Sequence, residues 1–122
     1  MKIYVAHSSS FDYQNELYEP LKQSGLAKAH KFFLPHDGGN PENSKDIIKD
    51  SDLLIAEVSY PSTGAGIEIG WANSFGVPIW AVYKEGTKPS SSIKHVAPKI
   101  FPYKDSADLV SILTGELKTM TK

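Results

Sequence analysis

The residues best placed to do chemistry are a glutamate, Glu68, and the glycine-rich stretch PSTGAG at residues 61–66 that precedes it. Ser62 is a residue type that caps helices, and Gly64 and Gly66 lack a Cβ atom, so we expect a tight turn that a ligand can approach closely. Glu68 would then lie in the first turn of the next helix, where the helix dipole keeps a carboxylate ionised. Such a carboxylate suits a nucleophile, although acidic residues are also common at ordinary helix starts.

Two apolar runs, at residues 53–58 and 79–82, flank this stretch and predict a strand, helix, strand unit of a parallel sheet. We expect Pro20 to kink an earlier helix and Gly25 to end it. The other predicted elements are strands at residues 2–6, 30–34 and 100–103 and helices at residues 11–24, 44–50 and 106–117. This alternation predicts one α/β domain over residues 1–122, a three-layer, doubly wound (Rossmann or flavodoxin-like) sheet of about five parallel strands.

The composition limits the partners that we expect. The chain has 122 residues and a net charge of −1, so it offers no basic surface for a nucleic-acid polymer. All 13 basic residues are lysines, so a bound phosphate would depend on backbone N–H groups, hydroxyls or lysine. No cysteine is present, no His, Asp and Glu spacing resembles a metal site, and we expect no cofactor. No apolar run reaches the roughly 20 residues of a membrane span, and the first residues lack a signal-peptide core, so we expect a cytoplasmic location without membrane contact.

The motif AEVSYPSTGAGIEIGWANSFGVPI at residues 56–79 resembles the nucleoside 2-deoxyribosyltransferase superfamily, in particular its 2′-deoxynucleoside 5′-phosphate N-hydrolase branch. The first strand, KIYVA, and the later SSSIK at residues 90–94 fit the same pattern more weakly. The resemblance implies that Glu68 is the nucleophile on the anomeric carbon of the sugar and that Tyr4 orients it. It also implies that Ser62 contacts a 5′-phosphate, because the transferase branch has an aspartate there that meets a free 5′-hydroxyl. It further implies a homodimer in which Ser90, or its neighbour Ser91 or Ser92, reaches the phosphate of the partner subunit's site.

The sequence departs from the family pattern around the group that should protonate the leaving base. Ser44 stands where the family has an acid–base aspartate, and Asp46 lies two residues later. His7 replaces the usual glycine after the first strand, where His7 and Ser8 are expected to contact substrate. Asp46, His7 and His36 remain the candidates for the proton donor, and each also has an ordinary structural explanation. The family's arginine in the first loop is absent.

Three functions remain open at this point. The first is an N-glycosidase that hydrolyses the base–sugar bond of a (deoxy)nucleoside 5′-monophosphate through a Glu nucleophile. The second is a nucleoside deoxyribosyltransferase, which shares the covalent step but admits a second base in place of water. The third is a nucleotide-binding or NAD-cleaving module, because residues 4–12 and 17–25 are similar to the start of TIR-type domains. The partner is a small nucleoside or nucleotide in all three, and the sequence specifies neither the base nor the sugar.

Overall fold

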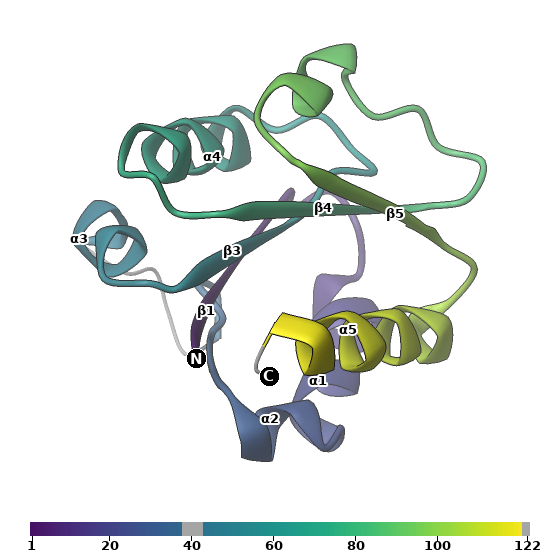
Figure 1. The fold of residues 1–122 in the computed structure, drawn as a ribbon. Helices are drawn as coiled ribbons and strands as arrows, with labels where there is room; N and C mark the ends of the chain where they lie inside the picture. The colour runs from purple at the N-terminus through teal and green to yellow at the C-terminus, as the bar shows by residue number, and fades with distance from the viewer. Residues whose placement is uncertain (38–42, 121–122) are drawn as a thin grey trace.

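The computed structural model describes residues 1–37 and 43–120 and contains one five-stranded parallel sheet (Figure 1). The strand order is β2–β1–β3–β4–β5, which is the flavodoxin-like order. The strands are β1 Lys2–His7, β2 Lys31–Phe33, β3 Leu53–Glu57, β4 Ile79–Lys84 and β5 Lys99–Tyr103. The α/β, doubly wound sheet of five parallel strands predicted from the sequence is therefore confirmed.

Helices cover both faces of the sheet and complete the three predicted layers. In Figure 1, α3 and α4 lie on one face, and α1, α2 and α5 lie on the other. The helical segments are η1 Gln14–Tyr18, α1 Glu19–Gln23, α2 Leu26–Ala29, α3 Ser44–Lys49, α4 Thr63–Ser74, η2 Ser91–His95 and α5 Ser106–Met120. No helix among the described residues is long and apolar enough to span a membrane.

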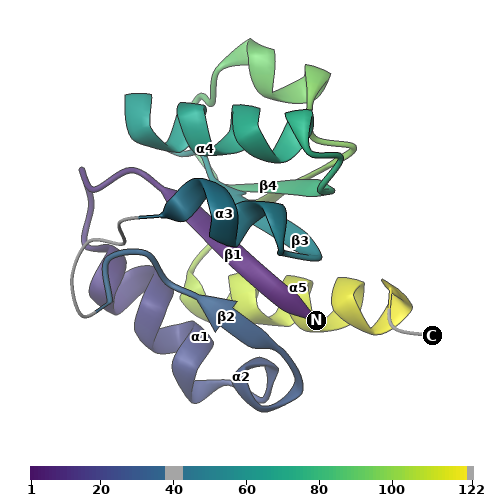
Figure 2. The ribbon, with the colours of Figure 1, turned by 90° about the vertical axis from the view of Figure 1, so that its left-hand side faces the viewer.

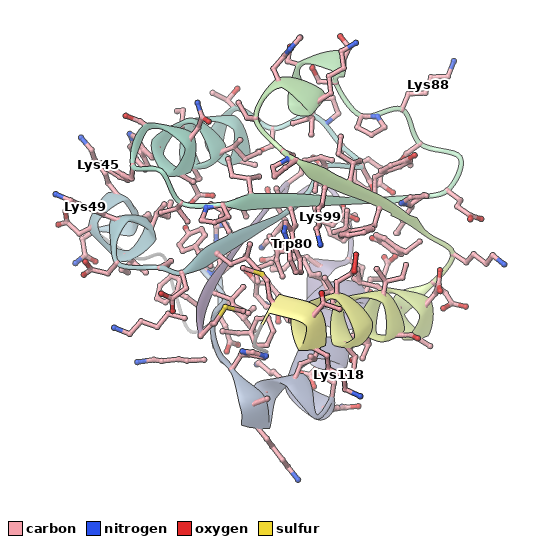
Figure 3. The ribbon with its side chains drawn as sticks, viewed as in Figure 1. Lys45, Lys49, Trp80, Lys88, Lys99 and Lys118 are labelled. Carbon is pink, nitrogen blue, oxygen red and sulfur yellow. The ribbon has the colours of Figure 1, made fainter. Side chains whose placement is uncertain are left out.

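The two-residue period of β1 sends alternate side chains into the two layers. Ile3 and Val5 pack in the core with α1 and α5, whereas Tyr4 and Ala6 pack in the core with α3 and α4. Trp80 of β4 belongs to the α5 side, where Figure 3 labels it between the sheet and that helix. The alternation matters for function because it turns the Tyr4 hydroxyl toward α4, the helix that carries Glu68.

The helix expected at residues 11–24 forms, but its first part is π-helical, and we attribute this change to Pro20. Its first turns form the π-helical segment η1, and α1 begins only beside Pro20, which lies in the first turn of α1. Pro20 has no N–H to donate to the carbonyl of Glu16 four residues earlier. The Ser106 hydroxyl donates to that carbonyl instead, at 2.7 Å.

The prediction that Gly25 ends this helix is wrong. The helix α1 ends at Gln23, and its C-cap is Ser24, whose hydroxyl donates to the carbonyl of Leu21 at 2.7 Å. Gly25 has a right-handed φ of −62° and caps the start of α2.

Candidate active site

A hollow of about 580 Å³ lies at the edge of the sheet where the strands end, beside the first turns of α3 and α4. Figure 2 shows the starts of these two helices at the same end of the molecule as the end of β1. This edge is where doubly wound sheets bind ligands, and β1 and β3 flank the point where the strand order reverses. The residues that line the hollow are His7, Ser9, His36, Asn43, Ser44, Lys45, Ser62, Gly64, Ala65, Ile67, Glu68 and Trp71.

The helix α4 presents Glu68 to this hollow, but its start differs from the expectation. The helix begins at Thr63, so Gly64 and Gly66 belong to the helix and not to a preceding turn. Neither glycine has a positive φ. Ser62 is the N-cap, as expected, and its hydroxyl accepts a hydrogen bond from the Ala65 N–H at 3.2 Å.

The helix α4 begins at Thr63, so Glu68 lies in its second turn and not in the first turn as predicted. The helix dipole is therefore not what controls its charge, since that effect fades beyond the first turn. Burial raises the pKa of the Glu68 carboxyl, while a hydrogen bond from Tyr4 and the charge of His36 act in the opposite direction. The carboxylate is thus more basic than an ordinary glutamate, and Tyr4 favours its ionised form.

Tyr4 is fully buried and donates its hydroxyl hydrogen to Oε2 of Glu68. Its ring stacks on Phe33 with the ring centres 5.3 Å apart, which fixes the direction of the hydroxyl. A hydrogen bond with the Ser44 side chain lowers the pKa of the Tyr4 hydroxyl, although burial raises that pKa overall. Ser44, Tyr4 and Glu68 therefore lie together at the wall of the hollow.

Both ring nitrogens of His7 are engaged by the protein. Nδ1 donates to the Ser8 carbonyl at 2.7 Å, because a carbonyl can only accept, and this leaves Nε2 to accept from the Tyr18 hydroxyl at 2.5 Å. The Tyr18 oxygen in turn accepts the backbone N–H of His36 at 3.0 Å. Burial lowers the pKa of His7, which agrees with a neutral ring that holds the loops in place.

Comparison with known proteins supports the family suggested by the motif. No protein-family model matches the chain. A protein of Syntrophotalea carbinolica that carries the provisional name 2′-deoxynucleoside 5′-phosphate N-hydrolase 1 is 46% identical over 54 residues. That match spans 43% of this chain but only 38% of the relative's length.

Solved structures share the fold over almost the whole chain. The CMP N-glycosidase of Clostridium botulinum superposes with a TM-score of 0.70 and 23% identity, covering 93% of this chain and 99% of the neighbour. The 2-deoxyribosyltransferase of Bacillus psychrosaccharolyticus superposes with a TM-score of 0.66 and 20% identity, covering 90% of each chain. The chain resembles the nucleoside 2-deoxyribosyltransferase superfamily. The resemblance found from the motif agrees with the name of the curated relative, and the prediction of an enzyme agrees with the names of these proteins.

Five of the site residues predicted from the sequence converge on the hollow, and His7 is one of them, because it lines the hollow. Glu68, Ser62 and Gly64 line it, and Tyr4 contacts it through Glu68. Ser44, the residue in place of the family aspartate, also lines it.

Other predicted residues lie elsewhere. The structure does not bring Asp46 to Glu68: it is exposed on α3 and does not line the hollow. Ser8 is buried, and its hydroxyl accepts the Ser10 N–H at 3.0 Å; its neighbour Ser9 lines the hollow instead. Ser90 and Gly66 line a second hollow, of about 600 Å³, on the other side of the α4 start. A contact of Ser90 with a phosphate therefore stays a prediction that depends on a partner subunit.

Lys45 and Trp71 line the hollow but were not among the predicted site residues. Lys45 follows Ser44 on α3, and Trp71 lies one turn beyond Glu68 on α4. Trp71 could have been found from its helical spacing to Glu68. Lys45 could not have been found from the sequence, because nothing in the sequence places the start of α3 against α4. Among the described residues, no cluster of three His, Asp or Glu side chains is arranged to hold a metal ion.

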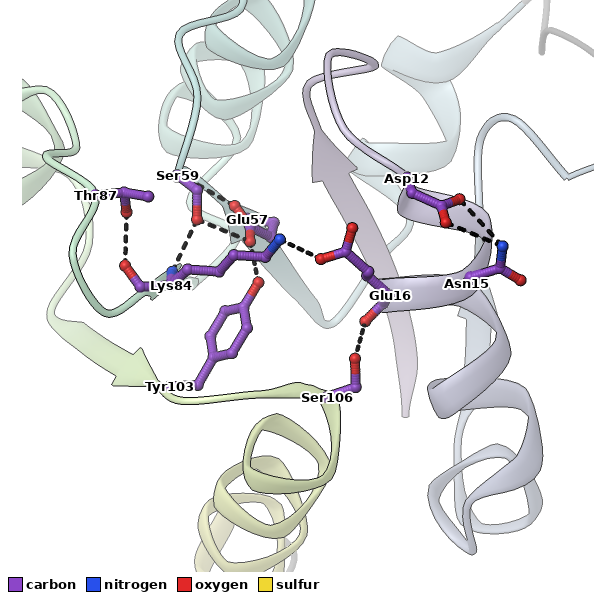
Figure 4. A network of polar contacts seen from close by, with 9 residues as sticks. All are labelled: Asp12, Asn15, Glu16, Glu57, Ser59, Lys84, Thr87, Tyr103 and Ser106. Atoms are coloured by element: carbon purple, nitrogen blue, oxygen red, sulfur yellow. Dashed lines mark hydrogen bonds and ion pairs between the residues drawn. The ribbon is translucent and has the colours of Figure 1, made fainter.

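Glu57, the last residue of β3, is the centre of a separate polar network (Figure 4). Its carboxylate accepts the Ser59 N–H at 2.6 Å, the Ser59 hydroxyl at 2.9 Å and the Tyr103 hydroxyl. Lys84 joins this network through its backbone N–H, which donates to the Ser59 oxygen at 2.8 Å, and its ammonium pairs with Glu16. Glu57 borders the second hollow but is only 1% exposed, so it ends and stabilises the strand.

Proposed function

We propose that the chain hydrolyses the N-glycosidic bond of a (deoxy)nucleoside 5′-monophosphate, with Glu68 as the nucleophile. The observation that carries this proposal is the Tyr4–Glu68 hydrogen bond at the wall of a hollow that also contains Ser62. The similarity to proteins named as an N-hydrolase and a CMP N-glycosidase supports the same reaction class.

The spacing on α4 suits a sugar phosphate. Gly64 and Glu68 are four residues apart, so they lie on the same face of the helix, separated by about 6 Å along its axis. Ser62 and Gly64 at the helix start would contact the phosphate, and Glu68 one turn later would face the anomeric carbon. The first N–H groups of a helix have no partner within the helix and favour an anion.

The reaction would proceed in two steps. The Glu68 carboxylate forms a bond to the anomeric carbon while the bond from that carbon to the base nitrogen breaks, and the base leaves with a proton. Water then attacks the same carbon and gives one proton to the group that had protonated the base, which releases the sugar 5′-phosphate and restores the carboxylate. Tyr4 would hold the attacking oxygen in place and favour its ionised form, which burial alone would disfavour.

We infer that His36 supplies the proton to the leaving base. His36 lines the hollow, and its charge acts on Glu68. Asp46 is less suitable because it does not line the hollow, and His7 is less suitable because burial lowers its pKa and disfavours the protonated ring that a donor needs. Histidine is the side chain that most often acts as a general acid or base in enzymes.

Base release tests the proposed reaction. The purified chain would be incubated with deoxy- and ribonucleoside 5′-monophosphates, the corresponding nucleosides and NAD, and free base would be measured by chromatography. We expect release from at least one monophosphate and none from Glu68→Gln. Formation of a new nucleotide on addition of a second base would favour the transferase. Release from NAD alone, or from no compound, would contradict the proposal.

A rescue experiment tests the proton donor. His36→Asn should lower base release by roughly 10²-fold, because a general acid contributes about that much or more. Adding Ser44→Asp to this variant should restore part of the rate, because it places a carboxylic acid beside Tyr4 in the same hollow. An unchanged rate in His36→Asn would show that another group donates the proton.

A further inference from the structure

The proposed substrate carries a phosphate with a charge of about −2, so its binding site needs positive charge or several N–H and O–H donors. The chain has no arginine that could bind the phosphate through two hydrogen bonds, and all of its 13 basic residues are lysines. The question is therefore which lysine can reach the hollow that contains Glu68.

Lys45 is the only lysine among the described residues that lines this hollow. Other lysines near the same edge have different surroundings: Lys84 pairs with Glu16 and Lys22 with Asp37, while Lys88 borders the second hollow. Lys45 directly follows Ser44, whose side chain interacts with the buried Tyr4. The start of α3 is thereby anchored beside Glu68, and Lys45 is held at the rim.

The opposite wall of the hollow offers neutral donors. The Ser62 oxygen already accepts the Ala65 N–H, so the hydroxyl hydrogen is left to donate. A Cβ atom on Gly64 would lie 4.0 Å from that oxygen, so Gly64 and the Ser62 hydroxyl are neighbours at the wall of the hollow. Ser62 and the first turn of α4 can thus contact one side of an anion, and Lys45 can contact it from α3.

We propose that Lys45 is the residue that makes the site prefer a 5′-phosphorylated nucleotide over the unphosphorylated nucleoside. This inference rests on the proposed function, because it assumes that the sugar lies against Glu68. The Lys45 ammonium supplies the point charge, and Ser62 with the helix start supplies directional donors. The other lysine on α3, Lys49, gives a matched control, since its ammonium lies 5.8 Å from the centre of the Phe75 ring and it does not line the hollow. Figure 3 labels both lysines.

Binding in a Glu68→Gln background tests the inference without requiring turnover. The affinities of the four deoxynucleoside 5′-monophosphates and of their nucleosides would be measured by calorimetry. Lys45→Gln should weaken the binding of the monophosphate roughly tenfold and that of the nucleoside less than twofold. Lys45→Arg should retain most of the affinity, and Lys49→Gln should leave both affinities unchanged. Added salt should weaken monophosphate binding less in Lys45→Gln than in the parent, because one ionic contact is missing.

Three results would overturn the inference. They are equal losses for monophosphate and nucleoside, a loss in Lys49→Gln as large as that in Lys45→Gln, and no measurable binding of any monophosphate. The outcome is separable from that of the base-release experiment. If Lys45→Gln weakens only monophosphate binding while the unmodified chain releases no base, the phosphate contact stands and the glycosidase proposal fails.

Discussion

Two glutamates stand at the same edge of the sheet, and each accepts a hydrogen bond from a buried tyrosine. Glu57, at the end of β3, is bonded by Tyr103 on the side of the sheet covered by α1 and α5. Glu68, on α4, is bonded by Tyr4 on the opposite side. The pairs have the same chemistry, so their difference shows what separates a structural carboxylate from one that can react.

The difference lies in how many donors surround each carboxylate and in its access to the hollow. Three donors from Ser59 and Tyr103 point at Glu57, which is 1% exposed. Glu68 accepts from Tyr4 and borders a hollow of about 580 Å³. A fully satisfied buried carboxylate stabilises its surroundings, whereas one with an open side can meet a substrate.

The largest expected effect separates the two glutamates directly. Glu68→Gln should lower base release by on the order of 10³-fold or more, because it removes the proposed nucleophile. Glu57→Gln should retain most of the rate per folded molecule but lower the free energy of unfolding by about 2 kcal/mol, because an amide places donors against the donors of Ser59 and Tyr103. Steady-state rates and urea unfolding measure both. Full activity in Glu68→Gln would show that Glu68 is not the nucleophile and that the two glutamates do not differ in this respect.

The tyrosines should differ in the same way. Tyr4→Phe should lower kcat by roughly 10-fold and move the acidic limb of the rate profile to higher pH. The reason is that the Tyr4 hydrogen bond lowers the pKa of Glu68, so its loss raises the pH at which Glu68 ionises. Tyr103→Phe should leave this limb in place. A shift of equal size in both variants would show that the two pairs are not independent.

Stability should also depend on pH in a way that reports on Glu68. Burial raises the pKa of its carboxyl above the ordinary value of 4.5, so the unfolded chain loses this proton first as the pH rises, and folding becomes less favourable. The Glu68→Gln variant has no carboxyl group at this position, so it does not lose stability in this way as the pH rises. Its Tm should exceed that of the unmodified chain by roughly 2–5 °C at pH 7, and the difference should vanish near pH 4. A lower Tm at pH 7 would mean that Glu68 stabilises the fold as Glu57 does.

The smallest effect is expected at the edge of the Glu57 network. The Lys84 ammonium pairs with Glu16, and both side chains are partly exposed. It also lies 5.3 Å from the centre of the Phe11 ring. Lys84→Met should therefore cost only about 0.5–1 kcal/mol of unfolding free energy in a urea titration. A cost as large as that of Glu57→Gln would show that the ion pair, and not the buried donors, dominates this network.

Much of the fold could be predicted from local patterns. Short apolar runs bounded by turn residues indicated all five strands, and β3 and β4 lie within two residues of the expected bounds. The misses have local causes. A π-helical segment precedes Pro20, because the missing N–H of Pro20 disrupts the α-helical hydrogen-bond pattern. The glycines that were expected to form a turn before α4 lie inside its first turn. The short helix η2 follows Pro89 and has no apolar period to reveal it.

The prediction of the site succeeded where a motif was continuous in the sequence. Ser62, Gly64 and Glu68 lie within seven residues of one another, and all three line the hollow. It failed on α3, where the orientation of the helix decides which side chain reaches the hollow. Asp46 and Lys45 are neighbours on α3, yet only Lys45 lines the hollow, because the direction of a helical side chain changes by about 100° per residue.

The sequence by itself determined the order of strands and helices and the presence of an acidic residue after a capped helix start, because these depend on residue type and on spacing over a few positions. Only the tertiary structure decided which glutamate is open to a ligand. Tyr4 and Glu68 are 64 positions apart, and Tyr103 and Glu57 are 46 apart. Such pairs form only when the sheet fixes which strands are neighbours and each strand directs alternate side chains to opposite faces. This arrangement sets the burial of Glu68 and hence the pKa of its carboxyl.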